Sequence, residues 1–367
     1  MKFTISRDAL LKPLNLVAGV VERRQTLPIL ANVLMVLEGD RLSLTGTDLE
    51  VELVGRVQLA GAGDSGEVTV PARKLVDICK SLPEGSDIQF AMQDNKVTVK
   101  SGRSRFTLST LPSREFPNVE DSLGTHQFKV KQGQLKRLID RTAFAMAQQD
   151  VRYYLNGMLW ELKGGQLRVV ATDGHRLALC TLPEKLNADG DTQVILPRKG
   201  VLELARLLLD EAAEAVVVIG RNHIRATTND FTFTSKLVDG KFPDYQRVLP
   251  RAPDKIVVGS RLELRQAFTR TAILSNEKYR GVRLKLTDNS LDIVANNPEQ
   301  EEAEEAVPVR YEGDPLEVGF NVSYLLDVLG VLSGDEVKLS LSDPNSSALL
   351  EESEEGDSLY VVMPMRL

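Results

Sequence analysis

The segment from Gly157 to Thr172, GMLWELKGGQLRVVAT, has an outline that occurs three times in this chain. The other two copies run from Asn32 to Thr47 and from Gly281 to Asn296, and each copy reads as a strand, a turn and a second strand. Successive copies start 125 and 124 residues apart. A repeat of this length can hold a hydrophobic core of its own, so the pattern predicts three similar domains rather than a solenoid of small units.

Each repeat is also predicted to contain two helices. The first follows a short strand, and apolar residues such as Leu135, Leu138 and Ile139 recur at the spacing of one helix face. In the third repeat, Ser260 and Glu263 form a capping-box pattern at the helix start. The second helices begin near Pro71, Pro197 and Asn321, and we expect both prolines in the first helical turn, where their fixed φ is favourable.

Further strands close each repeat. The closing strands of the first two repeats contain Phe106-Thr-Leu and Phe231-Thr-Phe, which we expect to be equivalent. The predicted fold class is α+β, with the two helices of each domain packed on one side of an antiparallel sheet. We place the domains at residues 1–125, 126–250 and 251–367.

The composition is ordinary for a globular chain, with 42% hydrophobic and 26% charged residues. No apolar run approaches the length of a membrane span, and the N-terminus lacks the apolar region of a signal peptide. The two cysteines, Cys79 and Cys180, lie in apolar surroundings without a C-x-x-C spacing. They read as reduced core residues of a cytoplasmic protein. A disulfide between them is the alternative.

Charge is distributed unevenly over the three repeats. The formal charges of residues 1–125, 126–250 and 251–367 are −1, +4 and −10, which give the net charge of −7. A protein that holds DNA mainly through its phosphates is normally basic overall. Any contact with nucleic acid must therefore be confined to one face of this acidic chain.

The domain size suggests how such a chain could reach DNA. A domain of about 125 residues has a diameter of roughly 35 Å. A closed ring of three such domains leaves almost no hole, whereas a ring of six leaves one about 35 Å wide, enough for a duplex. Two chains related by a twofold axis would make this ring, with repeat 1 of each chain against repeat 3 of the other.

The segment Thr172-Asp-Gly-His175 is the strongest catalytic-looking motif. An Asp and a His two residues apart could serve acid–base chemistry or a metal. However, the chain has three histidines, and no spacing of His or Cys completes a metal site. The matching stretch Thr47–Glu50 of repeat 1 has no histidine, so a turn-forming Asp is the simpler reading. A phosphate-binding loop of the G-x-x-x-x-G-K-[ST] type is also missing from the sequence. The alternative function is a repeat-built enzyme or ligand-binding protein that uses a cleft at Thr172–Leu177.

Five stretches carry a resemblance to a known family. They are LTGTDLE from Leu44, DVRYYLNGM from Asp150, ATDGHRLA from Ala171, NNPEQEEAEE from Asn296 and VVMPMRL from Val361. Together they closely resemble the family of the bacterial DNA polymerase III beta subunit, the sliding clamp, over the whole chain. The resemblance implies a homodimeric ring of six domains around duplex DNA, without catalytic activity and without a cofactor. It implies binding of the DNA polymerase III alpha subunit, the clamp-loader delta subunit, and other polymerases and repair proteins.

The family's DNA-facing surface implies the first site. The loop around Arg24 and the segment Gln149–Tyr154 resemble its duplex-contacting loops. The predicted DNA-contacting residues are Arg24, Arg73, Gln149, Arg152, Tyr153, Tyr154, Arg198 and Lys199. Basic side chains of this kind attract phosphates without reading bases. Each arginine taken singly also fits an ordinary solvated helix end.

The family's partner cleft implies the second site, which binds short peptides ending in hydrophobic residues between domains 2 and 3. The matching positions are Leu155, Thr172, Gly174, His175, Arg176, Leu177, Pro243, Arg247, Val248, Asn321, Tyr324, Val361, Met363, Pro364, Met365 and Arg366. Methionine suits such a groove because its side chain adapts to several ligands. An ordinary final strand in the core is the alternative for the Met-Pro-Met stretch.

The third site is the seam between two chains. Apolar Phe106 and Leu108 of repeat 1 are expected to meet Ile273 and Leu274 of repeat 3, inside an ionic rim. The rim residues are Lys74, Arg103 and Arg105 on one side and Glu299, Glu301, Glu302 and Glu305 on the other. Burial of the four apolar residues in ordinary domain cores is the alternative.

Overall fold

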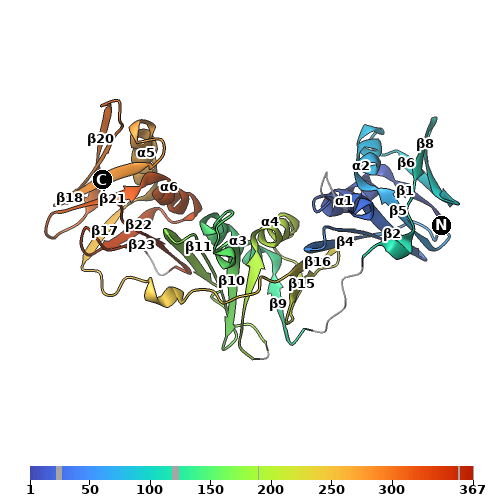
Figure 1. Ribbon diagram of the computed structural model, residues 1–367, viewed down its shortest axis with the longest axis horizontal. Coiled ribbons are helices and arrows are strands. Elements are labelled where there is room, and N and C mark those ends of the chain that lie inside the picture. Colours follow the sequence, from blue (N-terminus) through green and yellow to red (C-terminus); the bar gives the residue numbers. More distant parts are fainter. Residues whose placement is uncertain (22–26, 118–123, 189, 354–355, 367) are drawn as a thin grey trace. The chain divides into compact units, whose positions relative to one another are not determined.

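A computed structural model describes residues 1–21, 27–117, 124–188, 190–353 and 356–366, which form 24 strands and six α-helices (Figure 1). Three equal runs of elements follow one another along the chain, and each run has the order strand, helix, four strands, helix, three strands. The threefold repeat read from the sequence is therefore a repeat of topology.

The bounds of the elements follow the three repeats. Repeat 1 comprises β1 (Lys2–Ser6), α1 (Arg7–Ala18), β2 (Asn32–Glu38), β3 (Arg41–Thr47), β4 (Val51–Gln58), β5 (Gly66–Pro71), α2 (Ala72–Ser81), β6 (Asp87–Gln93), β7 (Lys96–Ser101) and β8 (Ser104–Ser109). Repeat 2 comprises β9 (His126–Lys131), α3 (Gln132–Thr142), β10 (Gly157–Lys163), β11 (Gln166–Thr172), β12 (Arg176–Thr181), β13 (Thr192–Pro197), α4 (Arg198–Leu207), β14 (Glu214–Ile219), β15 (His223–Thr227) and β16 (Phe231–Lys236). Repeat 3 comprises β17 (Lys255–Ser260), α5 (Arg261–Thr271), β18 (Gly281–Thr287), β19 (Ser290–Asn296), β20 (Glu302–Arg310), β21 (Leu316–Asn321), α6 (Val322–Val331), β22 (Glu336–Leu341), β23 (Ala348–Glu352) and β24 (Ser358–Val362). Short 3-10 turns are η1 (Pro28–Ala31), η2 (Ser113–Glu115), η3 (Ala143–Ala145), η4 (Tyr153–Leu155), η5 (Tyr245–Arg247) and η6 (Ala272–Leu274).

The strands of each repeat fall into two antiparallel groups of four. One group has the orders β5-β2-β3-β4, β13-β10-β11-β12 and β21-β18-β19-β20 in the three repeats, and the other has the orders β1-β6-β7-β8, β9-β14-β15-β16 and β17-β22-β23-β24. Sheets then continue from one repeat into the next, because β4 pairs with β16 and β12 pairs with β24. The first pairing gives an eight-stranded sheet. The second, together with a short pairing of β17 with β20 inside repeat 3, gives a twelve-stranded sheet, and β1-β6-β7-β8 stays a four-stranded sheet.

The chain divides into two compact units, and the division lies inside repeat 2. One unit is Met1–Gly133 with Asn187–Asp189 and Lys199–Leu237, and the other is Gln134–Leu186 with Gly190–Arg198 and Val238–Leu367. The reason is the shared sheets. Half of the strands of repeat 2 complete the eight-stranded sheet of the first unit, and the other half begin the twelve-stranded sheet of the second.

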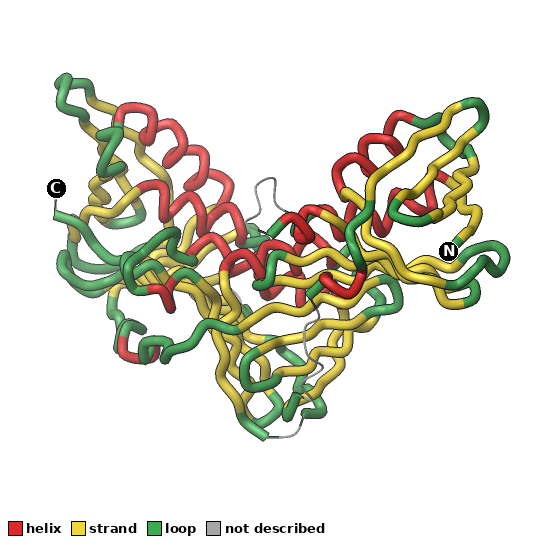
Figure 2. Tube along the Cα trace, turned by 45° about the vertical axis from the view of Figure 1, so that its right-hand side comes forward, coloured by secondary structure: helices red, strands yellow, loops and turns green. Residues whose placement is uncertain are grey.

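The helices cover one face of the strands within each unit (Figure 2). α1 buries Leu10, Leu14 and Val17, which lie on one side of the helix at the spacing of an amphipathic stripe. Ser260 caps α5 by accepting a hydrogen bond from the backbone N–H of Glu263 at 3.3 Å. The two prolines were expected in the first helical turn, but each ends the preceding strand one residue earlier, where a missing N–H removes no helical hydrogen bond.

Both cysteines are free and buried, as predicted. Burial raises the pKa of each thiol to about 11, so both are protonated and unreactive near neutral pH. Among the described residues, no helix is long and apolar enough to cross a bilayer.

Candidate functional site

The turn between β11 and β12 is built by its Thr and Asp side chains. Asp173 accepts hydrogen bonds from the backbone N–H groups of His175 (2.9 Å) and Arg176 (3.1 Å), while the Thr172 hydroxyl donates to the carbonyl of Arg176 at 2.6 Å. The turn Thr47–Val51 of repeat 1 has the same hydrogen bonds. The prediction of a turn-forming Asp is thereby confirmed, and the Asp–His spacing of repeat 2 is a consequence of turn geometry.

Arg176 connects this turn to repeat 3. Its guanidinium donates to the carboxylates of Asp173 (3.1 Å) and Asp327 and to the carbonyl of Phe144 (3.0 Å). Its carbon Cζ also lies 5.3 Å from the ring centre of Phe144 and 4.5 Å from that of Tyr324. Arg176 therefore fixes the ring of Tyr324 beside the turn and has most of its hydrogen-bonding capacity engaged within the protein.

The floor of the predicted cleft is a continuous apolar cluster. Leu177 pairs with Val361 across the β12–β24 ladder, so one strand of repeat 2 and one of repeat 3 meet at the floor. The cluster also contains Leu159, Val170, Leu179, Ile195, Phe242 and Tyr245, with Tyr154 packed against it. Leu155 is buried as well.

The C-terminal stretch lies beyond the last strand. β24 ends at Val362, and the next residue, Met363, is 41% exposed, so this stretch is not an ordinary final strand in the core. The Met363 N–H donates to the carbonyl of His175 and the Met365 N–H to the carbonyl of Gly319, both at 2.9 Å. These two bonds hold the tail between the turn of repeat 2 and β21 of repeat 3.

The other predicted cleft residues border this floor with different exposures. Gly174, His175, Pro243, Arg247, Val248 and Arg366 are exposed, while Thr172, Asn321, Tyr324, Pro364 and Met365 are half-buried. Asn321 also caps α6, since its side chain accepts from the N–H of Ser323 at 2.9 Å. An exposed rim around a buried apolar floor is the usual anatomy of a peptide groove.

A buried polar network anchors the segment that carries Pro243, Arg247 and Val248. The Tyr245 hydroxyl donates to Glu161 at 2.8 Å and accepts from Arg168 at 3.0 Å. Burial raises the pKa of this hydroxyl. Because these groups lie under the exposed rim residues, they hold one wall of the cleft on the sheet.

Replacing Tyr245 with Phe should release this wall. The change leaves Glu161 and Arg168 without one partner, which should lower the free energy of unfolding by about 1–3 kcal/mol. Hydrogen exchange should accelerate at the N–H of Val248, which donates to the carbonyl of Tyr245. The control is Tyr311→Phe, which removes a hydroxyl bond to Asp314 in repeat 3. Unchanged exchange at Val248 would refute the anchoring role.

The loop from Gln149 to Asn156 is rigidly built and presents part of the predicted DNA contact. The Asn156 side chain accepts from the N–H of Asp150 and donates to its carbonyl, both at 2.9 Å. The Arg152 guanidinium bonds the Asp150 carboxylate at 2.8 Å and holds its pKa at about 2. Gln149 is exposed and Tyr153 is 55% exposed, with Tyr153 packed edge-on against Tyr154.

The remaining predicted DNA contacts differ in their surroundings. Arg73 is exposed at the start of α2. Arg198 is half-buried and donates to the carbonyl of Met146 at 3.4 Å, and Lys199 forms an ion pair with Asp48. Arg24 lies outside the described residues. A phosphate would therefore have to compete with Asp48 for Lys199 and with Asp150 for Arg152.

The predicted seam residues differ in how far they are exposed in the single chain. Ile273 in η6 is 76% exposed, Leu274 and Phe106 are half-buried, and Leu108 is buried. Lys74, Arg103, Arg105, Glu299, Glu301 and Glu302 are exposed. Glu305 instead pairs with Arg270 of its own chain at 2.5 Å.

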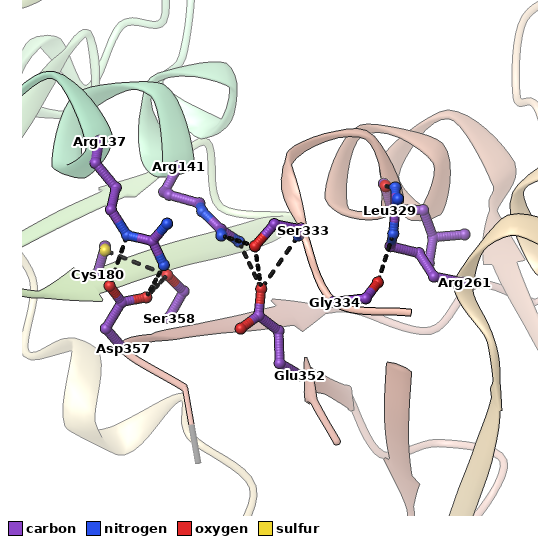
Figure 3. Close-up of polar contacts among 10 residues, drawn as sticks. All are labelled: Arg137, Arg141, Cys180, Arg261, Leu329, Ser333, Gly334, Glu352, Asp357 and Ser358. Carbon is purple, nitrogen blue, oxygen red and sulfur yellow. Dashed lines mark hydrogen bonds and ion pairs between the residues drawn. The ribbon is translucent and has the colours of Figure 1, made fainter. Parts of the chain in front are cut away.

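Repeats 2 and 3 are joined by charged side chains beside the β12–β24 ladder (Figure 3). Arg137 binds Asp357 through two hydrogen bonds of 2.8 and 3.0 Å. Arg141 donates to Glu352 at 3.1 Å and to the Ser333 hydroxyl at 2.7 Å. Burial alone would raise the pKa of Asp357 and of Glu352. Hydrogen bonds lower both, from Arg137 to Asp357 and from the Ser333 N–H and Arg141 to Glu352.

Comparison with known proteins assigns the family. Residues 1–120, 129–244 and 246–366 match the N-terminal, central and C-terminal domains of the DNA polymerase III beta subunit. The chain belongs to the DNA polymerase III beta subunit family. It is 67% identical to the Beta sliding clamp of Pseudomonas aeruginosa over the full length of both chains. The crystal structure of the DNA polymerase III subunit beta from that organism, at the same identity, superposes with a TM-score of 0.98 over 100% of both chains.

A second structure of the Pseudomonas aeruginosa sliding clamp was solved bound to griselimycin, and it also has a TM-score of 0.98, 67% identity and complete coverage of both chains. These findings confirm the predicted family and the α+β fold. As a member of this family the chain is a non-catalytic processivity factor in DNA replication, and the alternative of a repeat-built enzyme is not favoured.

Several residues around the cleft were not predicted. They are Phe144, Asp327, Tyr245, Arg141 and Glu352, each of which positions a predicted residue or its strand. For Phe144 the repeat offered a signal. α3 and α5 end at Thr142 and Thr271, so Phe144 corresponds to Ile273, which the sequence had already singled out. Asp327 also had a signal, since α2 and α4 carry the acidic residues Asp77 and Glu203 at the same position. The other three have no counterpart of the same kind in every repeat.

Proposed function

We propose that two copies of this chain close head to tail into a ring of six domains that encircles duplex DNA and carries partner proteins on its cleft. We place the domain boundaries of each chain near residues 125 and 250. The observation that carries this proposal is the way sheets continue between repeats, β4 to β16 and β12 to β24. By the same rule β20 of repeat 3 should pair with β8 of repeat 1. In the proposed ring this partner strand comes from a second chain, so that two chains pair at both of their ends.

The two observed ladders predict the register of this third one. Leu53 faces Phe233 in the first ladder, and Ala178 faces Tyr360 in the second. The hairpin registers make Ala303 the counterpart of Leu53 and Ala178. Phe106, Phe233 and Tyr360 are spaced by 127 residues and are all aromatic. We therefore set Phe106 opposite Ala303 of the partner chain.

This register also pairs the charges of the seam. It sets Arg105 of one chain directly opposite Glu304 of the other. Within its own chain Arg105 faces Lys100 across the β7–β8 ladder, a like-charge pair that is unfavourable until an acid approaches. An acidic strand against a basic strand also disfavours pairing of two identical edges.

The exposure of Ile273 has a matching explanation. Its counterpart Phe144 stacks on Tyr360, with ring centres 5.9 Å apart. Since Phe106 corresponds to Tyr360, Ile273 covers Phe106 of the partner chain in the proposed ring. Both side chains then become buried, as at the centre of a typical interface.

DNA passes through the ring without recognition of its base sequence. Gln149, Arg152 and Tyr153 on the rigid loop, with Arg73, Arg198 and Lys199, touch phosphates and sugars. The competing carboxylates Asp150 and Asp48 keep each contact weak, which favours sliding. Arg24 belongs to the same proposed set. The protein acts in the cytoplasm, where the DNA lies.

The cleft between repeats 2 and 3 binds short peptides ending in hydrophobic residues. The apolar floor of Leu177 and Val361 takes the hydrophobic end, and the exposed rim adapts to the rest. The proposed partners are the DNA polymerase III alpha subunit, the clamp-loader delta subunit, and other polymerases and repair proteins.

Topology separates this function from ordinary DNA binding. The protein, loaded on a nicked circle by a clamp loader and ATP, should remain bound during gel filtration in high salt, because a closed ring cannot dissociate sideways. Cutting the circle once should release it. Retention on the cut, linear DNA would show direct binding instead and would overturn the proposal.

A further inference from the structure

The interfaces between repeats 1 and 2 and between repeats 2 and 3 have the same strand pairing but different side chains at corresponding places. α1 and α3 begin 125 residues apart, so Lys12 and Leu16 correspond to Arg137 and Arg141. α4 and α6 begin 124 residues apart, so Leu209 corresponds to Ser333. The paired strands β16 and β24 are offset by 127 residues, which relates Asp230 to Asp357. The registers of the β15–β16 and β23–β24 hairpins then relate Thr228 to Glu352.

The interface between repeats 1 and 2 is open at these positions. Lys12, Leu16, Leu209 and Asp230 line a cavity of about 750 Å³. The Lys12–Asp230 pair is 3.4 Å long, and its side chains are 70% and 63% exposed. Such an exposed pair adds little to the attachment of one repeat to the other.

The interface between repeats 2 and 3 is filled at the same positions (Figure 3). Arg141 is 4% exposed and bonds both Glu352 and Ser333. Glu352 accepts three hydrogen bonds in total, one from Arg141 and two from the N–H and the hydroxyl of Ser333, each at 3.1 Å. Paired and hydrogen-bonded charges of this kind hold one geometry because every departure from it leaves a buried group unsatisfied.

The residues of this network lie on elements that also carry cleft residues, on the repeat 3 side and on the repeat 2 side. Ser333 follows α6, which carries Tyr324, and Glu352 ends β23, which pairs with β24 and its Val361. On the side of repeat 2, α3 continues beyond Arg141 into η3, and the carbonyl of Phe144 in η3 accepts a hydrogen bond from Arg176. A peptide held between walls from two repeats needs those walls at a fixed spacing.

We propose that Arg141, with Glu352 and Ser333, is a positioning residue of the partner cleft: it holds the α6 and β24 wall against the turn of repeat 2 without touching the peptide. This inference rests on the proposed peptide binding. The filled interface, between repeats 2 and 3, lies beside the proposed partner cleft. The open interface, between repeats 1 and 2, has no proposed partner site beside it.

The test uses the full-length chain and a fluorescent peptide ending in two large hydrophobic residues. Arg141→Met leaves the half-buried Glu352 without its charge partner, so it should lower both the Tm and the peptide affinity. The double variant Arg141→Met, Glu352→Met removes both charges, and apolar pairs of this size often restore stability. We expect its Tm to return to within a few degrees of the original, while the peptide Kd stays about 5–20-fold weaker.

Two controls give the outcomes their meaning. Lys12→Met breaks the corresponding pair at the open interface and should leave the peptide Kd within about twofold. Methyl NMR of the methionines should show shifts at Met363 and Met365 in the double variant and none at Met92 of repeat 1. Recovery of affinity together with stability in the double variant would overturn the proposal, because the network would then serve stability alone. Failure of the unaltered chain to bind the peptide would instead refute the proposed function.

Discussion

The double variant Ile273→Ala, Leu274→Ala is expected to be a folded monomer at concentrations where the unaltered chain is a dimer. Ile273 is 76% exposed in the single chain, so its truncation removes little of the domain core. In the proposed ring it covers Phe106 of the partner, and central apolar contacts of this kind are worth about 2 kcal/mol or more each. The closed dimer has two identical seams, so the double variant loses about 8 kcal/mol in all and the dimer Kd rises roughly 10⁶-fold. Sedimentation velocity over a concentration series measures it.

A matched control and a charge exchange complete this experiment. Leu202→Ala also truncates an exposed apolar side chain on a helix, and it should leave the dimer intact. Arg105→Glu should weaken the dimer by placing two acids face to face, and adding Glu304→Arg should restore it. A dimeric Ile273, Leu274 variant would refute the seam, whereas a failed charge exchange would refute the register alone.

Deletion of residues 363–367 is expected to abolish peptide binding while leaving the ring closed. The deletion begins after the last residue of β24, so the β12–β24 ladder is retained. It removes the exposed Met363, the half-buried Met365 and the two backbone bonds that tie the tail to His175 and Gly319. Loss of one wall of an apolar groove should weaken the peptide Kd by at least about 100-fold, or roughly 2.8 kcal/mol. Fluorescence anisotropy with the labelled peptide measures it.

The single change Met363→Ala should give a smaller loss, about 5–10-fold, because the tail backbone remains. Met92→Ala is the matched control, since Met92 is a similarly exposed methionine in repeat 1. Unchanged peptide affinity after the deletion would remove the tail from the cleft. Loss of the dimer together with the affinity would mean that the tail acts on the fold.

Much of the fold was predictable from local patterns. The strand-turn-strand copies, the helix stripes and the turn-forming Asp173 all depend on neighbours within a few residues. The closing strands show the limit. Phe106 was matched to Phe231 by its Phe-Thr motif, but the registers match it to Phe233. The two additional residues of repeat 2 lie before β14, since Phe3 pairs with Phe90, whereas the corresponding Phe128 pairs with Val217, two positions further along the repeat. An insertion so far from the motif is invisible when only the motif is compared.

The predicted site residues were also recovered unevenly, for a similar reason. Leu177, Val361, His175 and Met363 do come together, and the resemblance had named them. Lys199 and Arg152 were expected to contact DNA, and the pairing of each with an acid of the same chain was not predicted. Such pairing depends on which carboxylate the fold brings near, and Asp48 is far from Lys199 in sequence.

The sequence by itself determined the repeat, the order of elements within it, the family and the residue types of the three sites, because each of these is set by local spacing and composition. The tertiary structure alone decided how one repeat meets the next. The ladders β4–β16 and β12–β24 select the register of the seam, and the ion pair Arg141–Glu352 joins residues 211 positions apart. Contacts over such separations depend on packing of the whole chain, which no local pattern encodes.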